Sequence, residues 1–276
     1  MRFQKEVYEK YRTCSAKGKH IDARTPRYDR FQCPDELTAM LRPGKRIETE
    51  ELGIMEIPVS KIVGIASICG KESYAGNFLP IASPKSSYAE AWCNIYLKYL
   101  NDVEIAPILC YEYLGKFYVI DGKKRVSVMK CNNIPLIRAK VMRIYPVDKE
   151  SPEAIRYSEF LKTYETTGMY QIDFCPKYTL ADLNKAIGCD VNYKWNQYDR
   201  AFMQTVLQSV NSALKLGNLE HLSVNAIDAF MVLLEEHSYQ AATQMNLWEM
   251  AKCFKKNKKL LMGLYCTEKR AAKQIA

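Results

Sequence analysis

One short stretch of the 276-residue chain combines a glycine with a dense group of charges. It consists of a carboxylate, the glycine and three consecutive cations: Asp121, Gly122, Lys123, Lys124 and Arg125. Gly122 permits a sharp reversal after a strand predicted over residues 116–120. If a helix begins there, its first amide groups lack partners within the helix and, together with the helix dipole, attract an anion. The stretch therefore predicts a binding site for a phosphate or for the phosphates of a nucleotide.

The same residues also fit a plain turn. An Asp-Gly pair is common at hairpin corners, where neighbouring charged side chains simply face water. Asp121 has two interpretations as well: as the catalytic candidate it could position a metal or accept a proton, and as a structural residue it could cap the following helix. Arg125 is the expected principal phosphate ligand, because a guanidinium group can bind phosphate through two parallel hydrogen bonds.

Strands and helices are expected on both sides of this stretch. Before it, a strand over 108–113 and the strand over 116–120 form a hairpin through a two-residue turn, Leu114-Gly115. After it, a helix over 125–130 leads to a second strand over 137–143. The order of strand, glycine turn, helix and strand has about the length of one βαβ unit.

Further elements are expected upstream. They are helices over 1–19 and 34–41, a strand over 54–57, a helical turn over 60–63 and a helix over 88–100. Ser87 and Glu90 have the spacing of a capping box at the start of the last of these helices. Residues 66–84 are rich in Gly, Ser, Asn and Pro and predict a long loop. This loop either lies beside the phosphate site, where Lys71 and Lys85 would add charge, or is a surface excursion packed by Tyr74 and Phe78.

Three separated strings carry a resemblance to a known family. They are MEIPVSKIVG at 55–64, NFLP at 77–80 and VIDGKKRVSV at 119–128. In this order they resemble the ParB/sulfiredoxin superfamily, and most of all ParB-like proteins with a DGHHRVSVA pattern. The resemblance covers residues 54–144 and implies a small mixed α/β sheet with helices. It also implies a nucleotide or another phosphorylated ligand at Gly122 to Arg125, in a regulatory or DNA-associated role.

The departures from the family pattern limit the chemistry that the resemblance implies. Sulfiredoxin-like members carry a catalytic cysteine after the glycine, and Lys123 stands there, so sulfinic acid reduction is not expected. Members that hydrolyse CTP carry a glutamate at this place, so the lysine keeps a phosphate-binding charge and removes a carboxylate. Lys124 stands where the ParB-like proteins have histidine. The alternative function is a nucleotide hydrolase or phosphotransferase, with a nucleotide and Mg²⁺ as its cofactors and Asp121 as its catalytic residue.

The chain is expected to have three segments. These are an N-terminal helical arm over 1–50, a ParB/sulfiredoxin-like core over 51–148 and a helical C-terminal region over 149–276. The last is expected to extend the core, because the string EFLKTYETTGMYQIDF is similar to a segment that follows the core in ParB-like proteins. Helices are predicted there over 151–166 and 180–187, followed by three more that begin at Asp199, Ser223 and Ser238. The last two permit a helix-turn-helix, a pattern that any helical hairpin also gives.

The positive charge of the chain lies at its two ends. The formal net charge is +9, to which residues 1–30 contribute +5 and residues 252–276 contribute +7, so the remainder is net negative. Basic ends can bind nucleic acid through counterion release, or they can be solvated helix faces. The candidate DNA contacts are four lysines near the C-terminus: Lys255, Lys256, Lys258 and Lys259.

The cysteines predict a reducing compartment. All ten are spaced singly without a CxxC pair, and only three histidines accompany them, which argues against a zinc ribbon and for reduced, mostly buried thiols. Cys110 and Cys131 are expected to pack as small apolar side chains. No run of eighteen apolar residues and no signal-peptide pattern occurs. We therefore expect a cytoplasmic protein without a membrane partner, and we leave its oligomeric state open.

Overall fold

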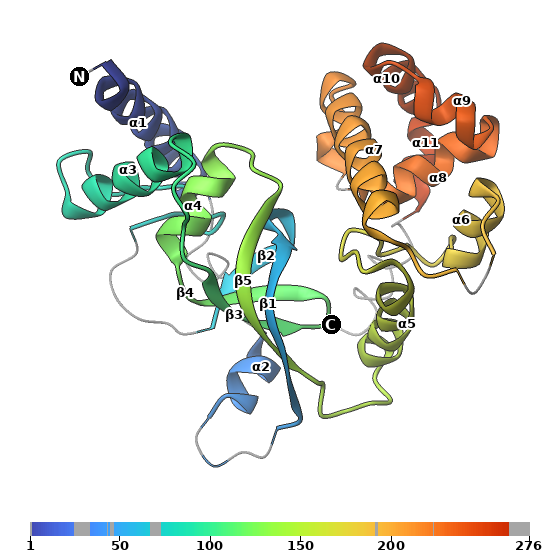
Figure 1. The fold of residues 1–276 in the computed structure, drawn as a ribbon, viewed down its shortest axis with the longest axis horizontal. Helices are drawn as coiled ribbons and strands as arrows, with labels where there is room; N and C mark the ends of the chain where they lie inside the picture. Colours follow the sequence, from blue (N-terminus) through green and yellow to red (C-terminus); the bar gives the residue numbers. More distant parts are fainter. Residues whose placement is uncertain are drawn as a thin grey trace. The chain divides into compact units, whose positions relative to one another are not determined.

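The chain divides into two compact units, residues 1–155 (unit 1) and residues 156–276 (unit 2). A computed structural model describes residues 2–24, 34–42, 44, 47–66, 73–190, 193–222 and 224–264. Unit 1 contains a five-stranded sheet with helices, and the described part of unit 2 is helical, so the predicted mixed α/β class is confirmed (Figure 1). The N-terminal helices, predicted as a separate arm, fall in the same unit as the sheet, and the C-terminal region forms a unit of its own.

The sheet of unit 1 is mixed. Its strands are β1 (Thr49–Pro58), β2 (Ile62–Ile65), β3 (Ile108–Tyr113), β4 (Lys116–Asp121) and β5 (Leu136–Ile144), in the spatial order β1-β5-β3-β4-β2. β3 is antiparallel to β4 and parallel to β5, whereas β1 is antiparallel to β5 and β2 is parallel to β4. The predicted hairpin of β3 and β4 is confirmed. The βαβ interpretation is wrong, because β3 lies between β4 and β5 and makes them antiparallel.

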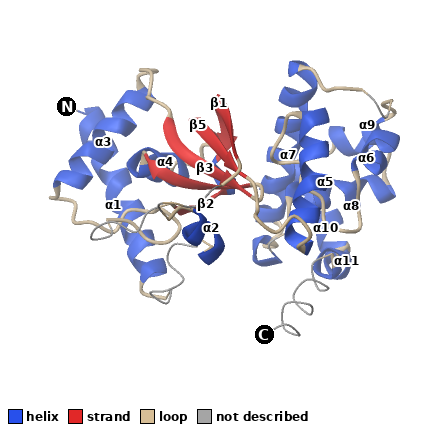
Figure 2. Cartoon of the chain, turned by 90° about the horizontal axis from the view of Figure 1, so that it is seen from below, coloured by secondary structure: helices blue, strands red, loops and turns tan. Residues whose placement is uncertain are grey.

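Unit 1 contains four α-helices within its described residues. They are α1 (Arg2–Asp22), α2 (Asp35–Met40), α3 (Ser87–Leu100) and α4 (Lys123–Cys131), and a short 3-10 turn, Val59–Lys61, links β1 to β2. All four helices were predicted to within a few residues. Ser86 and Ser87 both offer an N-cap for α3 in the sequence, and Ser86 caps it by accepting a hydrogen bond from the amide of Ala89, so the capping box of Ser87 with Glu90 is wrong. Figure 1 shows α1, α3 and α4 together, with α2 apart from them, and Figure 2 shows α1 and α3 on one side of the strands.

Strand β5 shows how the sheet is buried. Ile137, Ala139 and Val141 point to the face that α4 contacts and are nearly inaccessible to solvent, whereas Arg138 and Lys140 between them are exposed. The other face is covered at the opposite end of the sheet, where Leu37 and Met40 of α2 pack in a small cluster with Tyr113, Tyr118 and Ile144. Each face therefore has its own helix, and the two helices cover different ends.

Trp92 of α3 joins the helices on the α4 side. Its side chain is fully buried, its indole nitrogen donates a hydrogen bond of 3.1 Å to Ser127 Oγ of α4, and its ring lies 5.3 Å from that of Tyr11 in α1. The side chain of Trp92 thus belongs to the core, while Tyr99 near the end of the helix is 40% exposed. Helix α1 is packed on the rest of unit 1 through this contact.

The described part of the long loop is packed and does not form a free excursion. Tyr74 and Phe78 stack with ring centroids 5.7 Å apart, and both side chains are buried. Tyr11 of α1 donates a hydrogen bond to the carbonyl of Ala82, which fixes the end of the loop. These contacts match the predicted packing by Tyr74 and Phe78. Lys71, which was expected to add charge beside the phosphate site, lies outside the described residues.

A disulfide joins Cys14 of α1 to Cys131 of α4, with the two Cα atoms 6.1 Å apart. The prediction that the thiols are reduced and that Cys131 packs as an apolar side chain is therefore wrong for this pair. The partners are separated by 117 residues, and spacing in a sequence cannot show which cysteines pair. Five other described cysteines are free thiols, of which all except Cys189 are buried, as predicted.

Unit 2 is built around three helices that share one core. Its elements are α5 (Pro152–Thr167, shared with the end of unit 1), α6 (Leu180–Ile187), α7 (Gln197–Leu216), a 3-10 turn (Glu220–Leu222), α8 (Ala226–Glu236), α9 (Tyr239–Gln244), α10 (Leu247–Lys256) and α11 (Lys258–Gly263). Val210 of α7, Phe230 of α8 and Phe254 of α10 are all fully buried in this core. Unit 2 thus has a hydrophobic interior of its own.

Some predicted helix starts in unit 2 are displaced. Asn196 caps α7 and Asp199 completes its capping box from the third helical position, so the prediction that Asp199 is the cap is wrong. Ser238 begins a helix as predicted, but α9 ends after one short run and Asn246 caps α10 separately. Ser223, predicted to cap the preceding helix, lies outside the described residues.

Candidate functional site

Gly122 occupies a backbone position that other residues fill with difficulty. It is the N-cap of α4, with φ 102° and ψ 17°, in the left-handed region that favours glycine. A Cβ atom placed on it would lie 2.5 Å from Cγ2 and 2.9 Å from Cβ of Ile108, which is fully buried at the start of β3. Both the backbone conformation and the close approach of β3 therefore require glycine, as the predicted reversal implies.

The first turn of α4 leaves its amide groups without partners. The first backbone bond of the helix runs from the amide of Val126 to the carbonyl of Gly122, at 3.1 Å. Within the described chain the amides of the three preceding residues, Lys123, Lys124 and Arg125, have no hydrogen-bond acceptor, and no side chain caps the helix. The prediction that Asp121 caps it is wrong. Three free donors at the positive end of a helix are the arrangement that an anion requires.

Arg125 is turned towards the protein. Its Nη1 atom donates hydrogen bonds to the carbonyls of Ala106 and Pro107, at 2.7 and 2.6 Å, and its Nη2 atom lies 2.6 Å from Oδ2 of Asp121. Its side chain is 16% exposed, whereas that of Asp121 is 68% exposed. Arg125 thus ties the segment before β3 to the end of β4. Its binding of phosphate stays a prediction, and in this structure its terminal nitrogens already have acceptors.

Lys123 and Lys124 lie differently from Arg125. Lys123 is half-buried and Lys124 is exposed, with its ammonium nitrogen 5.6 Å from the ring centroid of Tyr88 in the first turn of α3. Burial raises the pKa of Tyr88 to about 12, so its hydroxyl stays neutral at neutral pH. The first turns of α3 and α4 therefore meet, a contact that sequence reasoning missed because it depends on how the two helices pack.

A cavity of about 290 Å³ lies beyond the segment that Arg125 holds. Its walls include Ala106, the exposed ends of Glu104 and Arg138, and the residue Asp102 after α3. Arg138 and Glu104 form an ion pair there. The cavity shares Ala106 with the contacts of Arg125 but is not lined by Gly122 or the lysines that follow it. It is therefore a neighbour of the α4 N-terminus and not part of it.

The C-terminal end of α4 is fixed more firmly. Lys130 donates a hydrogen bond of 2.6 Å to the carbonyl of Ile62, and its ammonium nitrogen lies 4.9 Å from the ring centroid of Phe78. Burial lowers the pKa of Lys130 to about 8. Cys131, the next residue, carries the disulfide to α1. Helix α4 is therefore anchored at one end and open to solvent at the other.

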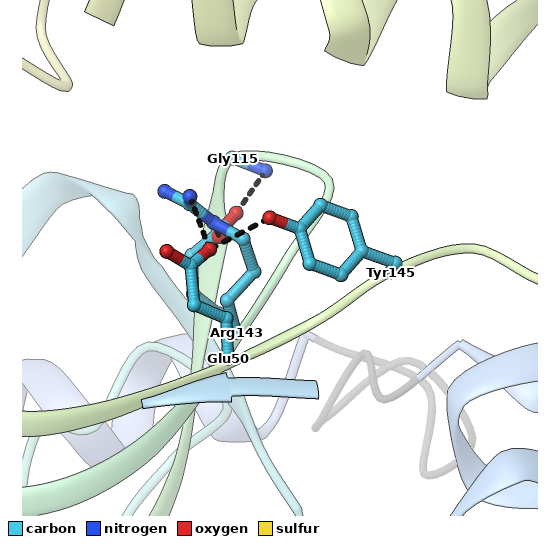
Figure 3. A network of polar contacts seen from close by, with 5 residues as sticks. Glu50, Gly115, Arg143 and Tyr145 are labelled. Carbon is cyan, nitrogen blue, oxygen red and sulfur yellow. Dashed lines mark hydrogen bonds and ion pairs between the residues drawn. The ribbon is translucent and has the colours of Figure 1, made fainter. Parts of the chain in front are cut away.

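A buried polar network lies at the far end of the β3–β4 hairpin (Figure 3). Glu112 is fully buried and accepts hydrogen bonds from the amide of Gly115, at 2.7 Å, and from Nε of Arg143, at 2.6 Å. Arg143 also donates to Glu50 at 3.1 Å, and the hydroxyl of Tyr145 donates to the same carboxylate oxygen at 2.6 Å. Figure 3 shows the side chains of Arg143 and Tyr145 converging on Glu50.

Sequence reasoning missed this network, although the sequence contains a signal for it. Glu112 is the one charge in β3, whose other residues are apolar or aromatic, and parallel register pairs it directly with Arg143 of β5. A buried charge requires a partner, so a lone charge in such a strand predicts an oppositely charged neighbour, and Arg143 is one of three cations in β5. Both side chains of the pair are nearly inaccessible to solvent, which suits a structural role better than ligand binding.

The four candidate DNA-binding lysines lie on α10 and α11, and all are exposed: Lys255, Lys256, Lys258 and Lys259. Lys256 contacts both carboxylate oxygens of Glu236 at 3.1 Å, so part of its charge is neutralised. The remaining basic residues of the C-terminal cluster, from 265 onwards, lie outside the described part of the chain. Their contact with DNA stays a prediction.

Comparisons with known proteins give no evidence about the function. Comparison with protein-family models, with curated proteins and with solved structures found no match for this chain. The resemblance to the ParB/sulfiredoxin superfamily therefore stays a prediction. Among the described helices, none combines the length and the apolar character that a bilayer crossing requires.

Proposed function

We propose that the chain binds a phosphorylated ligand, a nucleotide, at the N-terminus of α4. The observation that carries the proposal is the set of three consecutive free amides after Gly122, at the positive end of the helix dipole. A phosphate group has several acceptor oxygens and can accept from more than one of these amides. Hydrogen bonds to a charged group contribute about 1.5–3 kcal/mol each, so two or three of them suffice for specific binding.

The charged side chains have different roles in this proposal. Lys123 and Lys124 supply mobile cations beside the amides, and an ammonium group binds phosphate as a point charge. Arg125 acts chiefly by position, because its contacts with Ala106 and Pro107 hold β3 against Gly122. Tyr88 is buried in the first turn of α3, and its ring holds the ammonium group of Lys124 near the site through a cation–π contact.

A regulatory or DNA-associated role, as in ParB-like proteins, is the wider part of the proposal. The exposed lysines of α10 and α11 would supply the sequence-independent contacts with DNA phosphates. A cytoplasmic location belongs to the same proposal. A Cys14–Cys131 disulfide is unusual in that compartment, so the redox state of this pair in cells is a direct check on the location.

Calorimetric titration with ATP, CTP, GTP and inorganic pyrophosphate tests the ligand. The double variant Lys123→Gln/Lys124→Gln should weaken binding at least about tenfold, since each charge-assisted contact contributes about 1.5–3 kcal/mol. Lys116→Gln is the matched control, because Lys116 is an exposed lysine at the opposite end of β4 and should leave affinity unchanged. Equal affinity of all three proteins, or no binding by the wild type, would contradict the proposal.

Measuring phosphate release in the same titration samples distinguishes a binding protein from an enzyme. Phosphate release is followed with and without Mg²⁺, in the wild type and in Asp121→Asn. Binding without release supports a binding role, which we favour because Asp121 is already paired with Arg125. Release that depends on Mg²⁺ and is lost in Asp121→Asn would establish the alternative, a nucleotide hydrolase.

Point variants test DNA binding better than truncation, because Phe254 of α10 belongs to the core of unit 2. Filter binding of duplex DNA is measured over a range of salt concentrations with Lys255→Gln, Lys258→Gln and Lys259→Gln combined. Each lost phosphate contact should reduce the salt dependence of the logarithm of the binding constant by about one. An unchanged slope would exclude these three lysines as DNA contacts.

A further inference from the structure

Three potential metal ligands of different chemistry converge at the junction of α8 and α10 in unit 2. They are the carboxylate of Glu236, the imidazole of His237 and the thiol of Cys253, and one ligand atom from each lies within 4.8 Å of the other two. Glu236 is the last residue of α8 and His237 follows it in extended conformation, with φ −134° and ψ 148°. This break in the helix lets two consecutive residues face the same point, which adjacent residues within a helix do not do.

One of the three separations between ligand atoms matches a tetrahedral centre. Sγ of Cys253 lies 3.7 Å from Oε2 of Glu236. For zinc, with bonds of about 2.3 Å to sulfur and about 2.0–2.2 Å to oxygen, a tetrahedral angle places the two ligand atoms about 3.5–3.7 Å apart. The thiol and the carboxylate are therefore already at the distance that one shared ion would impose.

The sulfur already has a polar neighbour outside the cluster. The side-chain amide of Asn257 donates hydrogen bonds to Sγ of Cys253, at 3.5 Å, and to its carbonyl, at 3.2 Å, and a contact of this kind orients a metal ligand. In the metal-free protein the thiol proton points to Glu236, in the space between the two ligand atoms. A metal would replace this proton, so binding releases it to solvent.

A cation already occupies the outer side of the same carboxylate. The ammonium group of Lys256 lies 3.1 Å from each oxygen of Glu236. A carboxylate and a thiolate ligand together supply two negative charges, which balance a divalent ion, while the imidazole of His237 adds a neutral ligand.

We propose that Glu236, His237 and Cys253 form a three-ligand site for a divalent transition metal, with Zn²⁺ as the best fit, and that a water molecule completes the coordination. Sulfur, nitrogen and oxygen donors together suit zinc, whereas magnesium and calcium prefer oxygen alone. The bound ion links the end of α8 to α10, two helices that both contribute to the core of unit 2. The proposal is independent of ligand binding at α4.

Cobalt titration of the full-length protein tests this site, because Co²⁺ substitutes for zinc and is visible by absorbance. We expect intense sulfur-to-cobalt charge transfer in the wild type and its loss in Cys253→Ser. His237→Ala should weaken Co²⁺ and Zn²⁺ binding at least about tenfold, as loss of groups in a metal site does. Cys189→Ser is the control, since this partly exposed thiol lies outside the cluster and should change neither signal.

Lys256→Met should strengthen metal binding, whereas the variants of the ligands weaken it. Removing the competing ammonium group should strengthen metal binding by about two- to fivefold, which corresponds to an exposed ion pair. Because Lys256 is on the surface, the variant keeps the fold even if Cys253→Ser unfolds. The proposal is overturned if the wild type gives no charge-transfer band, or if Lys256→Met and His237→Ala both bind Zn²⁺ as the wild type does.

Discussion

The two ends of the β3–β4 hairpin carry the same pair of chemical groups in opposite settings. At the turn end, Nε of Arg143 lies 2.6 Å from a carboxylate oxygen of Glu112, and the two side chains are 7% and 0% exposed. At the other end, Nη2 of Arg125 lies 2.6 Å from Asp121, whose side chain is 68% exposed. The distances are equal, but the access of solvent is not.

The difference bears on which end is the better candidate for a ligand. Glu112 accepts from the amide of Gly115 and from Arg143, which also donates to Glu50, and both side chains of the pair are nearly inaccessible to solvent. The pair of Arg125 and Asp121 instead borders three amides that have no acceptor within the described chain. Unused hydrogen-bonding capacity beside an exposed pair, and not the presence of charge, is therefore what supports the proposed site at the N-terminus of α4.

Neutralising the carboxylates of Glu112 and Asp121 should give the largest difference in stability between the two ends of the hairpin. Glu112→Gln should lower the free energy of unfolding by about 3–5 kcal/mol, because it leaves the buried Arg143 without its main counter-charge. Asp121→Asn should lower it by less than about 1 kcal/mol, because an exposed ion pair contributes little. Urea denaturation measures both values. Equal losses would mean that the two ends are equally structural.

Removing the disulfide tests whether α4 is held from its C-terminal end. The double variant Cys14→Ala/Cys131→Ala should lower the free energy of unfolding by about 2–4 kcal/mol, because the bond closes a loop of 117 residues in the unfolded chain. Cys93→Ala, which removes a buried free thiol of α3, is the control for lost packing and should cost less. Peptide mapping without reductant would show whether the bond forms, and a reduced pair in the mature protein would contradict it.

The local elements of unit 1 could be predicted because each has a local cause. The run Lys116 to Ile120 is rich in β-branched and aromatic residues and is followed by Asp121-Gly122, and the Leu114-Gly115 turn fixes the hairpin, so β3 and β4 followed from neighbouring residues. The order of the strands could not be predicted in this way. Placing β3 between β4 and β5, and joining Cys14 to Cys131, depend on contacts between residues far apart in the chain.

The candidate site also combines local features that could be predicted with tertiary contacts that could not. Gly122 and the unpartnered amides after it were predictable, because a strand, a glycine and a helix determine them locally. The contacts of Arg125 were not, because the carbonyls of Ala106 and Pro107 reach it only through the packing of β3 against the turn. Asp121 was expected to cap α4, and the approach of Arg125 gave it another partner.

The pH dependence of stability tests how deeply the anchored end of α4 is buried. Lys130 has a pKa near 8 in the folded protein and 10.5 as its ordinary value. Between these values the unfolded chain binds more protons than the folded one, so the contribution of Lys130 to stability rises as the pH increases from about 8 to 10. The gain should be about 2 kcal/mol.

The buried thiols of unit 1 titrate in the same range with the opposite sign, because burial raises the pKa of Cys93 to about 11 and that of Cys110 to about 12. The measurement must therefore be a difference between the wild type and Lys130→Met, in which the thiol contributions cancel. Lys124→Met, at the exposed end of α4, is the control for the loss of a lysine from the same helix. A constant difference for Lys130→Met would mean that this lysine is solvated.

The smallest expected effect concerns the conformation of Gly122 and uses Gly53 as its match. Both glycines have positive φ, 102° and 75°, but an added Cβ at Gly53 meets no atom within 4 Å, whereas at Gly122 it meets Ile108. Alanine in a left-handed conformation costs about 1–2 kcal/mol. Gly53→Ala should therefore show the backbone cost alone, and Gly122→Ala should exceed it by about 1 kcal/mol through overpacking.

Ile108→Ala converts this comparison into a test of mechanism. If the excess cost of Gly122→Ala comes from the contact with Ile108, the double variant should recover the part that Cγ2 causes, because alanine at 108 removes this atom at 2.5 Å and keeps the Cβ atom at 2.9 Å. Thermal unfolding of the four proteins in the cycle measures the recovery. If none of the excess is recovered, the strain lies in the backbone of the turn. In that case the same turn that exposes the amides of α4 also bears the strain, and Gly122→Ala should lose nucleotide affinity even where it stays folded.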